Sequence, residues 1–186
     1  KRYYMKIPSE FDEIRPYEPE ELPVAYERLL SNPQFQMVMA YIMPGVPFDV
    51  IATKMRSCKT NLEFQKAFCY PFLESLLSKA SKGCDIDISA IDCTNRYTFI
   101  SNHRDIVLDS ALLAKLLIDA GFTTTCEIAI GDNLLFIPWV NDLVRINKSF
   151  KVERKLQRSE KLRSSKRLAE YMHFAIKEKN ENLWIA

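Results

Sequence analysis

From residue 97 onward, segments with strand character alternate with segments with helix character. Short apolar stretches that are typical of strands occupy residues 97–102, 126–130, 149–153 and 182–186. Between them, helical spacing or helix start and stop signals mark residues 109–120, 138–145 and 159–179. Strands that alternate with helices are typical of a sheet whose strands run parallel. The sequence therefore predicts an α/β fold, with a mostly parallel sheet flanked by helices.

The first part of the chain has a different, helical character. Residues 1–17 mix aromatic, charged and proline residues, and we expect an irregular arm there. Pro19 and Pro33 stand at positions typical of helix starts, and Thr60-x-x-Glu63 is a capping-box pattern that opens a helix to about Lys82, with Gly83 as its C-cap. We therefore expect an N-terminal helical region over residues 1–90 and an α/β domain over residues 91–186.

Charge is unevenly distributed along a chain whose net charge is only +2. Residues 145–167 contain ten Lys and Arg, opposed only by Glu153 and Glu160. A cluster of this size favours contact with an anionic ligand or surface, although one solvated helix face is the simpler interpretation of residues 155–167.

Five scattered cysteines favour a reducing compartment, because they form no C-x-x-C pair and no histidine stands at metal-ligand spacing from them. We expect neither a disulfide framework nor a metal site. The apolar runs are shorter than the roughly 20 residues that span a bilayer. We therefore expect a cytoplasmic protein, whose contact with membrane is peripheral and on the inner surface.

His103 stands at the junction between the strand expected at 97–102 and the helix expected at 109–120. A histidine and a carboxylate at such a junction can act as a general base and the acid that orients it. The other histidine, His173, lies in a charged helical pattern. A lone histidine at a strand end is more often a structural hydrogen-bonding residue. The flanking residues decide between these two roles.

The sequence His103-Arg104-Asp105 also occurs in the catalytic loop of protein kinases. A kinase would need Asn five residues after the Asp, where this chain has Ser110. It would also need a glycine-rich loop upstream, where this chain has only Gly45 and Gly83. These differences exclude the kinase interpretation.

Asn102-His103 followed by Asp109 resembles the first motif, N-H-x-x-x-x-D, of the glycerolipid acyltransferase family, which includes the glycerol-3-phosphate and 1-acylglycerol-3-phosphate acyltransferases. Here five residues, not four, separate His from Asp, so Asp105 is an alternative acid. Asp109 fits better because Leu-Asp precedes an apolar helix start, as in the family. Residues 136–139 (Phe-Ile-Pro-Trp) are similar to the family's Ile-Pro-aromatic entry into a short helix.

Residues 148–154 (Lys-Ser-Phe-Lys-Val-Glu-Arg) resemble the family's second motif, in which a strand ends in acid-Arg. The family usually has Gly at the position of Lys148 and an apolar residue at that of Lys151. The third motif, Glu-Gly after the next strand, has no counterpart, and residues 183–186 are similar to the strand that leads into it. We therefore expect the α/β domain to be incomplete at its C-terminal end.

The resemblance implies transfer of a fatty acyl group from acyl-CoA or acyl-carrier protein to a hydroxyl of a glycerol-phosphate or lysophospholipid acceptor. It implies no bound cofactor or metal, no nucleic acid partner, and peripheral contact with anionic membrane. The alternatives are a non-phosphate acceptor, such as an amino-acid lipid or a glycan, or a non-catalytic module that binds anionic lipid. By the resemblance, His103 is the base, Asp109 or Asp105 its orienter and Arg154 the phosphate ligand, with Lys148, Arg145, Asn102 and Arg104 as further substrate-binding candidates.

Overall fold

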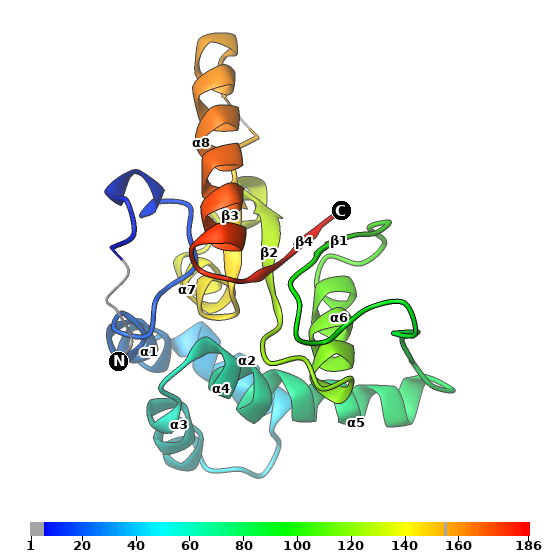
Figure 1. Ribbon diagram of the computed structural model, residues 1–186. Helices are drawn as coiled ribbons and strands as arrows, with labels where there is room; N and C mark the ends of the chain where they lie inside the picture. Colours follow the sequence, from blue (N-terminus) through cyan, green and yellow to red (C-terminus); the bar gives the residue numbers. More distant parts are fainter. Residues whose placement is uncertain (1–5, 155) are drawn as a thin grey trace. The chain divides into compact units, whose positions relative to one another are not determined.

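The computed structural model describes residues 6–154 and 156–186 (Figure 1). The chain divides into two compact units. The first, here called the sheet unit, comprises Lys1–Arg15, Ile86–Leu135 and Ser149–Ala186. The second, here called the helical unit, comprises Pro16–Asp85 and Phe136–Lys148.

The sheet unit contains four parallel strands in the order β1-β4-β2-β3. Register is fixed in the middle of the sheet, where Trp184 of β4 pairs with Phe99 of β1 and with Ile128 of β2. The α/β class, the parallel sheet and the preceding helical region are therefore confirmed. The elements of this unit are η1 (Ser9–Phe11), β1 (Thr98–Ile100), α6 (Leu108–Asp119), β2 (Cys126–Gly131), η3 (Asp132–Leu134), β3 (Ser149–Val152), α8 (Arg158–Lys177) and β4 (Asn182–Ile185).

Alternation of side chains along the strands gives the sheet two apolar faces, each covered by one helix (Figure 1). On one face, Ile128 and Trp184 pack with Leu117 of α6. On the other, Leu183 and Phe150 pack with Tyr171 and Ala175 of α8 and with Phe11 and Ile14. We call these two sides of the sheet the α6 face and the α8 face. A side chain at the carboxyl end of a strand lies on one or the other.

Residues 6–15 are irregular apart from η1, as expected, but they are packed against the sheet unit and do not form a free arm. Phe11 and Ile14 are 3% and 2% exposed, and the Phe11 ring lies 5.4 Å from that of Tyr171, edge to face. The backbone N–H of Lys151 donates to the carbonyl of Ile14 at 2.7 Å. Apolar burial therefore attaches this segment to the α8 face and to the outer edge of β3.

The helical unit is built around a core that includes Leu22, Tyr26 and Met55. Thr60 is the N-cap, as predicted, since its Oγ1 accepts the N–H of Glu63, but the Glu63 side chain accepts the N–H of Lys59 and not that of Thr60, so only half of the predicted capping box forms. The helix after it contains a π-helical turn and ends at Ala80, so the expectation of Gly83 as C-cap was wrong. The elements are α1 (Leu22–Leu30), α2 (Pro33–Ile42), α3 (Phe48–Ser57), α4 (Asn61–Phe64), η2 (Gln65–Cys69), α5 (Tyr70–Ala80) and α7 (Pro138–Ile146).

Within the described ranges 6–154 and 156–186, no helix combines the length and apolarity that crossing a bilayer requires.

Candidate active site

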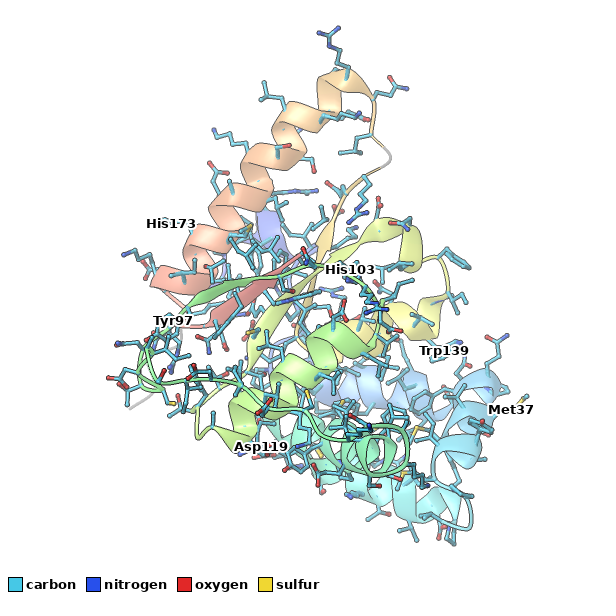
Figure 2. The ribbon with its side chains drawn as sticks, turned by 90° about the vertical axis from the view of Figure 1, so that its right-hand side faces the viewer. Met37, Tyr97, His103, Asp119, Trp139 and His173 are labelled. Carbon is cyan, nitrogen blue, oxygen red and sulfur yellow. The ribbon has the colours of Figure 1, made fainter. Side chains whose placement is uncertain are left out.

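His103 lies in the loop that connects β1 to α6, at the carboxyl edge of the sheet (Figure 2). Because all four strands are parallel, the loops after β1, β2 and β3 leave this same edge. Ligands of open α/β sheets commonly bind outside the carboxyl ends of the strands. His173, by contrast, belongs to α8 and lies away from this loop (Figure 2).

The structure pairs His103 with Asp109. Nδ1 of His103 lies 3.1 Å from Oδ2 of Asp109, and the two side chains are 43% and 22% exposed. A carboxylate at Nδ1 favours the tautomer with the proton on Nδ1, which leaves Nε2 as a proton acceptor. None of the described residues forms a hydrogen bond with Nε2. The imidazole is therefore accessible and oriented as a general base would be.

Two backbone amides also converge on the same oxygen of Asp109. The N–H groups of Arg104 and Asp105 donate to Oδ2 at 2.6 and 3.0 Å. Hydrogen bonds from Asp105 and Arg104, with a smaller contribution from His103, lower the pKa of the Asp109 carboxyl. Asp109 therefore stays ionised at neutral pH, and the loop folds around it despite the additional residue between His and Asp.

Asp105 has a different role in the same loop. Its Oδ1 accepts the N–H of Val107 at 2.9 Å and that of Leu108, the first residue of α6, at 2.8 Å. These two hydrogen bonds lower the pKa of the Asp105 carboxyl. The side chain thus caps the turn that leads into α6, in the manner of a helix N-cap. The carboxylate in contact with His103 is that of Asp109.

The ring of His103 packs against Trp184 in the central strand. Their centroids are 5.8 Å apart with an interplanar angle of 67°, an edge-to-face contact. Trp184 is 4% exposed and its Nε1 donates to Oγ of Ser101 at 3.0 Å. The imidazole is therefore supported on the α6 face by β4 and oriented by Asp109.

Arg154 follows β3 and lies against the end of β2. A Cβ added to Gly131 would be 2.9 Å from Nε of Arg154. The backbone N–H of Arg154 donates to Oδ1 of Asp132 at 3.2 Å. Arg154 follows β3 in the sequence, but its exposed guanidinium lies at the end of β2. Strand β2 is one strand nearer than β3 to β1, which leads to His103.

His103 and Arg154 share the carboxyl edge but reach it from different faces. Gly131 pairs with Val152, which belongs to the α8 face, whereas His103 contacts Trp184 on the α6 face. Two interstrand spacings separate β1 from β2, roughly 10 Å. A ligand that touches both side chains would have to lie across the ends of β4 and β2.

The remaining predicted residues divide between the two units. Asn102 and Arg104 are exposed in the His103 loop. Lys148 is buried immediately before β3, at the amino end of that strand, and the Arg145 guanidinium lies 4.1 Å from the ring centroid of Tyr17 within the helical unit. The structure therefore gathers Asn102, His103 and Arg104 in the loop after β1, with Asp109 in the first turn of α6, and does not bring Lys148 to the carboxyl end of its strand.

Sequence reasoning missed two residues of this edge. Trp184 was recognised only as a strand residue, because strand order, which places it beside His103, is not encoded in local spacing. Gly131 was not singled out, although it directly follows the strand expected at residues 126–130. Glycine directly after an apolar strand is the signal that could have indicated a close approach of another group.

A parallel α/β sheet with an accessible histidine–carboxylate pair at its carboxyl edge is an arrangement suited to general acid–base chemistry. Within the described residues, no group of three or more His, Cys, Asp or Glu side chains could hold a metal ion.

Comparison with known families identifies the chemistry more closely. The sequence pattern named Acyltransferase matches residues 87–186, more than half of the chain, and the chain belongs to this family. The match includes β1 to β4 and both His103 and Arg154. Comparisons with curated proteins and with solved structures returned no match. The protein is an acyltransferase by family.

Proposed function

We propose that this protein transfers a fatty acyl group from acyl-CoA or acyl-carrier protein to a hydroxyl of a glycerol-phosphate or lysophospholipid acceptor. The observation that supports the proposal is the 3.1 Å contact between His103 Nδ1 and Asp109 Oδ2 within the matched segment. It provides a base for the hydroxyl, which is what acyl transfer to an alcohol requires.

In the proposed reaction, Nε2 of His103 takes the proton of the acceptor hydroxyl while its oxygen attacks the thioester carbonyl. The carboxylate of Asp109 stabilises the imidazolium that forms. When the tetrahedral intermediate collapses, the C–S bond breaks and the imidazolium returns the proton to the departing thiolate. The products are an ester and a free thiol, and no acyl-enzyme intermediate is needed.

Arg154 is the proposed ligand for the acceptor's phosphate, since a guanidinium can bind two phosphate oxygens at once. Arg104 is a second candidate because it belongs to the His103 loop. An acceptor held by Arg154 would extend over the ends of β2 and β4 to present its hydroxyl to His103. Lys148 and Arg145 are weaker candidates, given the burial of Lys148 and the stacking of Arg145 on Tyr17.

The test measures thiol release from acyl-CoA with glycerol phosphate, lysophosphatidic acid and matched unphosphorylated acceptors. We expect His103→Ala to lower kcat about 10²- to 10⁴-fold in a protein with unchanged thermal unfolding. Arg154→Ala should raise KM about 10- to 100-fold for phosphate-bearing acceptors only. Full activity of His103→Ala would refute the mechanism, and a preference for unphosphorylated acceptors would replace the phosphate acceptor by a neutral one.

The first half of α8 supports a further part of the proposal, peripheral contact with anionic membrane. Leu162 is 79% exposed there, among the exposed cations Arg158, Lys161 and Arg163. Charge reversal at Arg158 and Arg163 should weaken sedimentation with anionic vesicles, whereas His103→Ala should not. If His103→Ala retained all function and charge reversal abolished it, the protein would be a lipid-binding module and not an enzyme.

A further inference from the structure

The side chains of Asn133 and Arg154 together occupy the space that a Cβ at position 131 would fill. A Cβ on Gly131 would lie 2.5 Å from Oδ1 of Asn133, and 2.9 Å from Nε and 3.2 Å from Cζ of Arg154. Favourable contacts between non-bonded heavy atoms lie at about 3.5–4.0 Å. Gly131 therefore provides the surface on which the guanidinium rests.

The backbone of Arg154 is bound to the same end of β2. Its N–H donates to Oδ1 of Asp132, the residue after Gly131, at 3.2 Å. Both the main chain and the side chain of Arg154 thus depend on the geometry of this strand end.

The residue before Arg154 is fixed to α8. Oε2 of Glu153 accepts hydrogen bonds from Oγ of Ser164 at 2.7 Å and from Nη2 of Arg167 at 2.6 Å. The Glu153 and Arg167 side chains are only 16% and 25% exposed. Burial alone would raise the pKa of the Glu153 carboxyl, but the hydrogen bonds from Ser164 and Arg167 outweigh it and lower the pKa. The pair is therefore ionised at neutral pH.

We infer that Arg167 and Gly131 are positioning residues for Arg154. Arg167 holds Glu153, and with it the loop that carries Arg154, against α8, while Gly131 leaves room for the guanidinium at the end of β2. The inference rests on the proposed function, in which Arg154 binds the acceptor's phosphate. Bidentate binding depends closely on the direction of the guanidinium, so loosening either support should weaken acceptor binding more than the chemical step.

A double-mutant cycle on the full chain tests this inference. Arg167→Ala should raise KM for glycerol phosphate about 3- to 10-fold, with kcat within about 2-fold. In an Arg154→Ala background the same change should have no further effect on KM, because the side chain being positioned is absent. Calorimetric titration with glycerol phosphate gives the binding constant independently of turnover.

Two further variants separate positioning from general loss of structure. Arg167→Lys keeps a donor for Glu153 and should restore most of the lost affinity. Lys166→Ala is the matched control: it removes a positive charge from the neighbouring position of α8 and from the lining of the same cavity of about 660 Å³, but Lys166 pairs with Glu170 and not with Glu153. It should leave KM unchanged. Gly131→Ala should raise KM like Arg167→Ala, and if it fails to fold, the Arg167 cycle decides alone.

The outcomes distinguish this inference from the function on which it rests. If Arg154→Ala leaves KM unchanged, Arg154 is not the phosphate ligand, and that part of the proposed function is refuted together with this inference. If Arg154→Ala raises KM but Arg167→Ala has no effect, or an effect that adds fully to that of Arg154→Ala, the proposed function stands and the positioning role is refuted.

Discussion

At the scale of single residues, one carboxylate oxygen organises the loop that carries His103. Oδ2 of Asp109 contacts the imidazole and accepts the N–H groups of Arg104 and Asp105. The loop therefore closes around the carboxylate that contacts His103. Asp105 completes it by capping the turn before α6. Two neighbouring aspartates thus have separate tasks, and substitution can tell them apart.

Asp109→Asn is expected to lower kcat for acyl transfer about 10²-fold or more, because the amide favours the wrong imidazole tautomer and cannot stabilise an imidazolium. Asp105→Asn should retain nearly full activity, since Asn caps helices about as well as Asp. Thiol release under saturating substrates measures both. The opposite ranking would make Asp105 the orienting acid.

Lys148 carries the backbone strain of a position where the acyltransferase resemblance leads one to expect glycine. Its φ is +65°, in the left-handed region that costs a residue with a Cβ about 1–2 kcal/mol. Lys148→Gly and Lys148→Ala remove the same side chain, but only the first removes the strain. We expect the glycine variant to be more stable than the alanine variant by about 1–2 kcal/mol. Urea unfolding measures this difference, and equal stabilities would show that the backbone there is unstrained.

The site could be predicted from sequence to the extent that its residues are near neighbours in the chain. His103 and Asp109 are separated by one short loop, so a motif with the right residue types was enough to indicate the pair. The contacts of Arg154 with Gly131 and of His103 with Trp184 could not be predicted in this way. They depend on strand order and on side-chain direction, which arise from packing of the whole sheet.

At the scale of elements, a buried ionic network attaches α8 to β2. Glu127 of β2 is 1% exposed, and its carboxylate accepts hydrogen bonds from Tyr171 of α8 and, at 2.7 Å, from Lys179 just after that helix. Burial raises the pKa of Glu127, opposed chiefly by the charge of Lys179. The network thus depends on Lys179 to keep a carboxylate inside the fold.

Lys179→Met should destabilise the sheet unit by about 3–5 kcal/mol, because it leaves a buried carboxylate without its cation. Combining it with Glu127→Gln should recover much of the loss, since no unpaired charge then remains. Urea unfolding of the single and double variants gives the coupling free energy between Lys179 and Glu127. Additive losses would show that the two side chains act independently.

Elements with strong local signals were predicted well, and those set by tertiary burial were not. The N-cap at Thr60 and the alternation of strands and helices are local, and the structure has both. Helix α3 was missed, because its N-cap is Pro47, which makes no side-chain capping hydrogen bond. The segment with Phe11 was assigned as an arm, because only the α8 face shows why it is buried.

At the scale of the whole molecule, both units contain carboxylates whose pKa is lowered by basic partners. In the helical unit, burial opposes ionisation of Asp142, but hydrogen bonds from Arg28 and Tyr17 outweigh it and lower the pKa. In the sheet unit Glu153 has the same property through Ser164 and Arg167. Such groups contribute stability that is complete above their unfolded pKa and is lost as pH falls through the folded pKa.

Acid should therefore destabilise the protein below about pH 4, near the unfolded pKa values of Asp and Glu. Asp142→Asn should lower stability at pH 7. It should also flatten the dependence of stability on pH between about pH 5 and pH 3, the range around the ordinary pKa of Asp. Thermal unfolding across that range measures both effects. If the stability of the variant fell with pH as steeply as that of the unmodified protein, Asp142 would not contribute to the acid response.

Strand β4 lies between β1 and β2, although it follows both of them in the sequence. During synthesis on the ribosome, β1 emerges long before Asn182–Ile185, the one strand with which it pairs in the described sheet. Until then the backbone N–H and C=O groups of β1 have no strand with which to form hydrogen bonds, and the Trp184 ring that contacts the imidazole is absent. The edge-to-face support of the His103 ring is consequently acquired only after residue 184 has been synthesised, and a nascent chain arrested before residue 182 would expose an unpaired strand and be prone to aggregation.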